Sequence, residues 1–311
     1  MKNLFFFLAL LLITGCSKSE INDSKSINNQ IFVTSIIRKN YNLSNSVIRT
    51  QTTNVVNNKI QNTTITFPAS SQTSVSTYNY LNNRISTIES FFNAILTTKT
   101  YFIYDASNKL IEYRTESFNN SGQIQSVNKH IFYRMQNIVY SNWTRSINSQ
   151  SFVSISNAEI MLDQNLNRIN FKEHDIVNNE QKKIVTVYDN NNNILTEEYF
   201  SLNSSGLYNS YLINSYSYGT AINTLAFINL QSIGKENIML LYHLNSNAIN
   251  EVNVKSFSPN VINTFISTFD DNIIFNIINQ VDSNNYSRFS EYNCYNANNF
   301  ISKFSFEFIL N

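Results

Sequence analysis

The stretch VTVYDNNNNILTEEYFSLNSSG, residues 185–206, carries the pattern that decides the fold. Apolar and polar side chains alternate up to Tyr188, a run of Asp and Asn follows, and the alternation resumes at Ile194. In an extended strand, alternation places every second side chain on the same face. Asp and Asn turn the chain because their side chains bond the nearby backbone, and Asn also tolerates left-handed backbone angles. The stretch therefore predicts a β-hairpin.

Related segments recur along the chain, which indicates that this hairpin is one unit of a repeat. The clearest copies are YFIYDASNKLIEYRTESFNNSG (residues 101–122) and STYNYLNNRISTIESF (residues 76–91). The anchor positions before the turns are Val56, Tyr80, Tyr104, Tyr133, Leu162, Tyr188, Tyr218, Tyr242 and Cys294, with a weaker one at Phe269. Neighbouring anchors up to Tyr242 lie about 24 to 30 residues apart, enough for two strands and two turns. We therefore predict about 16 to 20 strands.

Composition supports a folded β protein and argues against a nucleic-acid partner. The 311 residues include 23 Phe and 18 Tyr, and aromatic residues make up 14% of the chain, whereas a disordered chain has few aromatic residues. The formal net charge is +1, and no basic patch stands out. Nucleic-acid binding needs clustered Lys and Arg to replace phosphate counterions. We expect no nucleic-acid partner.

The N-terminus, MKNLFFFLALLLITGCSKSE, has the form of an export signal. Lys2 gives a positive start, and residues 4–13 form an apolar run that is too short to span a bilayer. The following Ile13-Thr14-Gly15-Cys16 resembles the bacterial lipobox, which implies cleavage before Cys16 and attachment of lipid to its sulfur. The alternative is an ordinary secretory signal in which the cysteine is accidental.

Lipid at Cys16 would anchor the mature chain to a membrane without a spanning helix. Ser17 follows the cysteine, and by resemblance to lipoprotein sorting in Gram-negative bacteria this favours the outer membrane; the periplasmic and surface faces both stay open. We assign residues 1–15 to the signal peptide, residues 16–30 to the lipidated cysteine and a flexible tether, and residues 31–311 to the β-hairpin repeat domain.

The repeats YFIYDASNKLIEY and VTVYDNNNNILTEEY resemble the tyrosine–aspartate repeats of the RHS type, with Asn or Lys replacing the turn glycine. The whole chain also resembles uncharacterised repeat lipoproteins of Bacteroidetes, especially flavobacteria. The resemblance implies a sheet of successive hairpins on a lipid anchor, and it brings no catalytic residues. The expected fold class is all-β, with consecutive antiparallel hairpins in a long twisted or curled sheet that is an open half-barrel or solenoid-like.

Motifs that carry chemistry are scarce. His130, His174 and His243 have no second ligand at zinc-site spacing, and the chain contains no P-loop or nucleophile-elbow motif. We therefore expect no enzymatic activity, no metal and no cofactor. Trp143, the single tryptophan, and Tyr140 form a possible ligand platform, because exposed aromatic rings stack on sugars or grip partner surfaces. Alternatively, Trp143 caps the core at a sheet end.

Two functions follow from this reading. The first is an outer-membrane-anchored, non-catalytic binding or scaffold module for a glycan or a protein partner. The second is a periplasmic-type carrier that holds a lipid or another apolar ligand in a curved half-barrel. A carrier needs a concave apolar face with a closed end, whereas a scaffold needs a long sheet with largely polar or aromatic faces.

Overall fold

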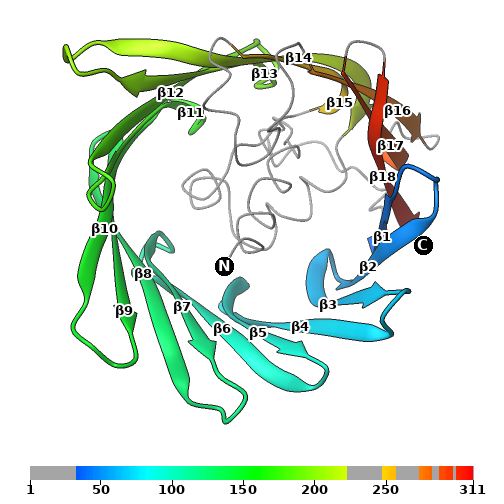
Figure 1. Ribbon diagram of the computed structural model, residues 1–311, viewed down its shortest axis with the longest axis horizontal. Coiled ribbons are helices and arrows are strands. Elements are labelled where there is room, and N and C mark those ends of the chain that lie inside the picture. The colour runs from blue at the N-terminus through cyan, green and yellow to red at the C-terminus, as the bar shows by residue number, and fades with distance from the viewer. Residues whose placement is uncertain (1–32, 223–246, 257–272, 282–286, 297–298, 311) are drawn as a thin grey trace.

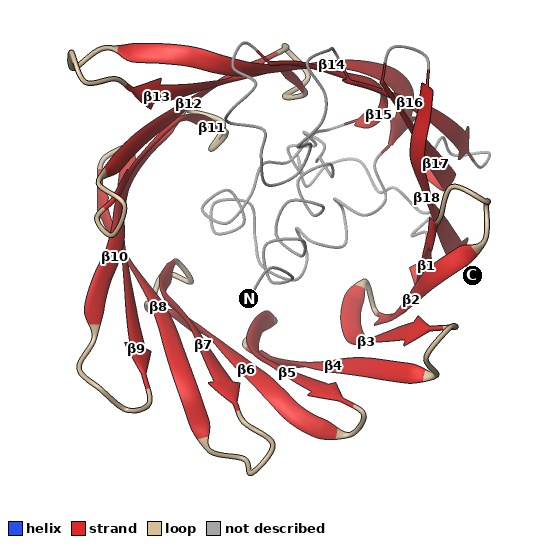
Figure 2. Cartoon of the chain, viewed as in Figure 1, coloured by secondary structure: helices blue, strands red, loops and turns tan. Residues whose placement is uncertain are grey.

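The computed structural model describes residues 33–222, 247–256, 273–281, 287–296 and 299–310. Within these ranges the chain forms only strands and their connections (Figure 2), and no helix there is long and apolar enough to cross a bilayer. The strands are β1 (Val33–Tyr41), β2 (Val47–Val56), β3 (Lys59–Phe67), β4 (Gln72–Leu81), β5 (Arg84–Phe92), β6 (Ile95–Tyr104), β7 (Leu110–Phe118), β8 (Ile124–Met135), β9 (Ile138–Ile147), β10 (Val153–Leu162), β11 (Arg168–Asp175), β12 (Glu180–Tyr188), β13 (Ile194–Leu202), β14 (Tyr208–Ile222), β15 (Asn247–Ser256), β16 (Ile273–Val281), β17 (Ser287–Asn296) and β18 (Asn299–Leu310). The signal peptide, Cys16, the tether, and the anchors Tyr242 and Phe269 lie outside the described residues.

The strands form one 18-stranded antiparallel sheet in which each strand pairs with the next along the chain. This confirms the all-β class, the consecutive hairpins and the expected range of strand number. The sheet curls further than the open half-barrel that the sequence suggested. Because β1 pairs with β18 as well as with β2, the sheet closes into a cylinder (Figure 1).

The hairpin turns lie at two opposite rims of the cylinder. Turns that follow odd-numbered strands, such as β5–β6, β7–β8 and β9–β10, project outward in Figure 1, and we call their side the flared rim. Turns that follow even-numbered strands, such as β4–β5 and β6–β7, form the other side, which we call the tight rim. Val33 at the start of β1 pairs with Leu310 at the end of β18, so both described chain ends lie at the tight rim.

Asx side chains build the five-residue turns, as the sequence predicted. In the β12–β13 turn, the Asp189 Oδ1 accepts hydrogen bonds from the backbone N–H groups of Asn191 and Asn193, both at 2.8 Å. Asn192 takes the left-handed backbone conformation, with φ of 61°. The same arrangement recurs in turns that begin at Asp105, Asp163, Asn119 and Asn203. Asn can replace the turn glycine of the tyrosine–aspartate pattern because it tolerates this conformation.

Side chains before the tight-rim turns reach back to the preceding hairpin. The Tyr80 hydroxyl donates to the Ile60 carbonyl at 2.7 Å, and the Tyr188 hydroxyl donates to the Arg168 carbonyl at 3.2 Å. In the β8–β9 hairpin, Arg134 has this role and donates from Nη1 to the Leu110 carbonyl at 2.8 Å. Each such bond ties one repeat to its neighbour and satisfies a backbone acceptor.

Two predicted anchors are displaced by one residue. Val56 and Tyr133 are more than half exposed, and the positions expected for them are taken by Val55 and Arg134. Val55, Arg134 and Tyr80 are each the next-to-last residue of the strand that precedes a two-residue turn, so they occupy equivalent positions in their hairpins. A shift of one residue moves a side chain to the other face of the sheet, which explains the exposure.

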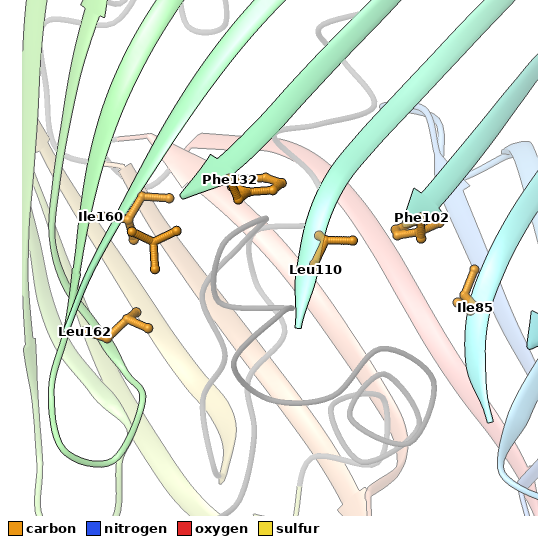
Figure 3. Packing of buried hydrophobic residues seen from close by; sticks show 7 residues of the cluster. Ile85, Phe102, Leu110, Phe132, Ile160 and Leu162 are labelled. Carbon is orange, nitrogen blue, oxygen red and sulfur yellow. The ribbon is translucent and has the colours of Figure 1, made fainter. Parts of the chain in front are cut away.

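The concave wall of the cylinder carries the main apolar cluster, shown in Figure 3. The buried members are Ile85, Phe102, Leu110, Phe132, Val139, Ile160 and Leu162, with exposed fractions from 0% to 7%. They come from consecutive hairpins near the tight rim, and tyrosines such as Tyr78 and Tyr104 pack against them. Alternate side chains of each strand face opposite sides of the sheet. We call the concave side, which bears this cluster, the inner wall, and we call the convex side the outer wall.

The outer wall is polar along the middle of its strands. Cross-strand ion pairs join Lys99 to Glu89 at 2.7 Å and Lys129 to Glu112 at 3.0 Å. The Arg114 guanidinium lies over the Tyr101 ring at 4.4 Å. Pairs this exposed contribute little stability each, but they keep the convex surface hydrated.

Candidate functional site

Four aromatic side chains stand next to one another on the inner wall, one on each strand from β6 to β9. Phe102 lies opposite Tyr113, Tyr113 opposite His130, and His130 opposite Trp143. Their ring centroids are 5.2, 5.9 and 5.4 Å apart in that order. We call these four residues the aromatic row. Directly opposed aromatic side chains on neighbouring strands stabilise each other, so the row is both a packing feature and a preformed surface.

The row is electrically neutral at neutral pH. His130 stacks on Trp143 with an interplanar angle of 9°, and it lies 6.5 Å from Phe132 with nearly parallel rings. Burial among these rings lowers the pKa of His130 to about 4, because desolvation disfavours the imidazolium. Burial also raises the pKa of the Tyr113 phenol. The row therefore offers ring faces, one neutral imidazole and one protonated hydroxyl.

The inner wall changes character on either side of the row. Toward the tight rim lie the buried aliphatic side chains of the apolar cluster. Toward the flared rim lie hydroxyl groups, including Thr100 and Thr115, whose side chains hydrogen-bond at 3.1 Å, and Ser76 and Ser90 at 2.8 Å. The aromatic row thus forms the boundary between an apolar layer and a layer rich in hydroxyl groups.

The structure does not bring the two predicted platform residues together. Trp143 lies on the inner wall, half-buried, between His130 on β8 and Ser156 on β10. Tyr140 lies opposite Tyr133 and Glu159, and its side chain is exposed on the outer wall. Residues three apart on a strand face opposite ways, so only Trp143 belongs to the aromatic row.

Glu197 marks a second inner-wall feature that sequence reasoning missed. It is 5% exposed, and desolvation raises its pKa despite hydrogen bonds from Tyr216, Asn214 and Tyr199. In the sequence Glu197 looks like half of a surface pair with Glu198, but alternation turns one inward and the other outward. Because its oxygens are hydrogen-bonded by Tyr199 on its own strand and by Tyr216 and Asn214 on β14, the carboxylate serves to hold β13 and β14 together.

Metal ligands do not gather in the described part of the chain. No group of three or more His, Cys, Asp or Glu side chains is placed there to hold an ion. His174 and its neighbour Glu173 face opposite walls, and Glu173 accepts a hydrogen bond from the Ser156 hydroxyl at 2.8 Å. The chemistry that the described inner wall offers is stacking and hydrogen bonding.

Comparison with known proteins leaves the site to be argued from this chain. No family model matches the sequence, and no curated protein matches it. Among solved structures, a porin-like protein from Bacteroides vulgatus is similar over 90% of this chain and 99% of its own, with 11% identity and a TM-score of 0.42. A porin-like protein from Bacteroides uniformis covers 90% and 98% of the two chains, with 6% identity and a TM-score of 0.32. The TcdB2-TccC3-Cdc42 structure matches 84% of this chain but only 14% of its own, with 8% identity and a TM-score of 0.26.

The neutral state of His130 predicts an acid-sensitive fold. The unfolded imidazole titrates near pH 6.5 and the folded one near pH 4, so between these values the unfolded state binds the extra proton. Stability is therefore lost as pH falls through this window, by about 2 kcal/mol between pH 7 and pH 5 from His130 alone. We expect His130→Phe, which keeps a stacked ring, to remove that loss. Urea unfolding at the two pH values, followed by Trp143 fluorescence, measures it.

Tyr140→Phe is the matched control, because it changes an aromatic side chain on the outer wall, away from the row. The loss of stability between pH 7 and pH 5 should persist in this variant. Equal pH dependence in wild type and His130→Phe would contradict the burial of a neutral imidazole against Trp143.

Proposed function

We propose that this chain is a lipid-anchored, non-catalytic binding module of the bacterial outer membrane, and that its aromatic row binds a glycan. The observation that carries the proposal is the position of the row, with ring faces at one level of the inner wall and hydroxyl groups beside it. Tyr113, His130 and Trp143 are half-buried and already held in place by one another and by the buried Phe102, so the site needs little reorganisation to receive a ligand.

A sugar matches this boundary better than a purely apolar ligand does. A pyranose has a C–H face that packs on an aromatic ring, and its rim of hydroxyl groups exchanges hydrogen bonds with Ser and Thr side chains. Trp143, supported by the stacked His130 ring, provides a ring face at the level where Thr100, Thr115 and their neighbours begin.

The alternative, a carrier for a lipid or another apolar ligand, has less support. A carrier needs apolar inner surface that is free to receive its cargo. The aliphatic side chains of the apolar cluster are at most 4% exposed, because they already pack against one another. They form part of the core of the fold, and the half-buried inner-wall side chains beside them on β6 to β9 are aromatic and polar.

The proposed lipid anchor at Cys16 would orient the cylinder relative to the membrane. Cys16 is separated from Val33 by a 16-residue segment whose root-mean-square span as a flexible chain is about 22 Å. Since β1 enters the sheet at the tight rim, lipid on Cys16 holds that rim toward the bilayer. The flared rim, with the hydroxyl-bearing side of the row, then faces away from the membrane.

The binding proposal is tested by removing the central ring. Trp143→Ala should weaken binding of an oligosaccharide by about 5- to 150-fold, because loss of one stacking contact in a preformed site costs about 1–3 kcal/mol. Isothermal titration of the mature chain in detergent measures it. Tyr140→Ala is the matched control on the outer wall and should bind like the wild type. Unchanged affinity in Trp143→Ala would count against the row as the binding site.

The anchor is tested separately. Cys16→Ser should move the protein from the membrane fraction to the soluble fraction of the envelope, because it removes the sulfur that carries the lipid. Cell fractionation with labelled fatty acid gives the result, and Cys294→Ser serves as a control that keeps both label and membrane attachment. A membrane-bound, unlabelled Cys16→Ser protein would show that another feature anchors the chain.

A further inference from the structure

Arg145 lies beside the aromatic row and has no partner in the described part of the chain. It follows Trp143 by two residues on β9, so the two side chains share the inner wall. Its strand neighbours in register are Asn128 on β8 and Val153 on β10. The Arg145 Nε is buried without a hydrogen-bond acceptor, and so is the Trp143 Nε1. The Arg145 Nε–H and the Trp143 Nε1–H are therefore two neighbouring donors on the inner wall without an acceptor among the described residues.

Other arginines of the inner wall are already engaged. The Arg38 guanidinium lies over the rings of Phe304 and Phe306 at 5.2 and 5.3 Å. Arg134 donates to the Leu110 carbonyl, and the Arg168 guanidinium lies over the Phe171 ring at 5.2 Å. These three serve packing and the links between repeats, and Arg145 differs from them.

Acidic side chains near this place on the inner wall are also committed elsewhere. Glu173 accepts the Ser156 hydroxyl, and Asp175 accepts the backbone N–H and the side-chain amide of Asn178 at 3.0 and 2.8 Å. The pKa of Asp175 is lowered by those hydrogen bonds. Among the described residues, these hydrogen bonds therefore leave the positive charge of Arg145 available to a ligand.

The unpaired donors define the chemistry of the missing acceptor. A buried donor without an acceptor is unfavourable, and an incoming oxygen that satisfies it restores the lost interaction. The planar guanidinium matches the two oxygens of a carboxylate or sulfate, and hydrogen bonds between charged groups are stronger than neutral ones. The indole N–H of Trp143 can donate to a neighbouring ring oxygen or hydroxyl.

We infer that the ligand of the aromatic row is an acidic saccharide. Its sugar ring stacks on Trp143, which the His130 ring supports from the other side, and its carboxylate or sulfate pairs with the Arg145 guanidinium. This inference rests on the proposed glycan-binding function and adds the charge of the ligand.

The test compares oligosaccharides that differ only in the acidic group. The mature chain in detergent is titrated with a galacturonate oligomer, a sulfated galactose oligomer and a neutral galactose oligomer of equal length, with Trp143 fluorescence as the readout. Trp143 is the only tryptophan, so the signal reports the row itself. We expect at least one acidic oligomer to bind tenfold or more tightly than the neutral one, and the two acidic arms tell carboxylate from sulfate recognition.

Variants at Arg145 then locate the charge. Arg145→Gln should remove the acidic preference, so that acidic and neutral oligomers bind alike, and Arg145→Lys should keep part of it, because the charge remains without the planar fork. Arg114→Gln on the outer wall is the matched control and should behave like the wild type; near-UV circular dichroism checks that each variant folds. Equal binding of neutral and acidic oligomers, or an acidic preference that survives in Arg145→Gln, would overturn the inference while leaving glycan binding intact. Failure of all three oligomers to bind would overturn both.

Discussion

The backbone ladder between β1 and β18 is the contact on which the rest of the structure depends. An open sheet of eighteen strands would expose two edges whose N–H and C=O groups invite pairing with other chains. Here Ile36 pairs with Phe308 and Arg38 with Phe306, so the first and last described strands satisfy each other. Closure removes the edges, and it also gives the sheet an inside and an outside.

Once the sheet is closed, the alternation of side chains along each strand decides which residues face the inner wall and which face the outer wall. The same two-residue period that sends Lys99 and Glu89 to the outer wall sends Phe102 and Tyr113 to the inner wall. The links from Tyr80, Arg134 and Tyr188 to the preceding hairpins keep the repeats in register. A slip of one residue would carry the row to the outside, so the site depends on the register as much as on the identity of its residues.

Local features of this fold could be predicted from the sequence, because they are set by neighbours in the chain. The hairpin unit, the Asx turns and the range of strand number follow from alternation and from residues such as Asp189 and Asn192. Closure could not be predicted in this way, since the β1–β18 ladder joins segments about 270 residues apart and has no local signature. Anchors at Val56 and Tyr133 were misplaced by one residue, because aligning short degenerate repeats does not fix which face a side chain takes.

The candidate site shows the same division. Trp143 could be singled out as the one tryptophan, but its partners could not, because the contact with His130 depends on cross-strand register. Tyr140 was paired with Trp143 through closeness in sequence, whereas the strand separates them onto opposite walls. Arg145 and Glu197 could not be identified as inner-wall residues from the sequence, since the sequence does not show which charged residues face inward.

Closure itself is tested most directly by a disulfide across the seam. Ile37 and Glu307 are register partners on the outer wall, and Cα atoms of such antiparallel partners lie within the range that a disulfide can bridge. In a Cys294→Ser background, Ile37→Cys with Glu307→Cys should oxidise to an intramolecular disulfide in monomeric protein, seen by mass spectrometry of non-reduced peptides. Ile37→Cys with Tyr140→Cys, on distant strands, should keep free thiols. If the seam pair also kept free thiols, or linked only between molecules, the closed cylinder and its separate inner wall would be contradicted.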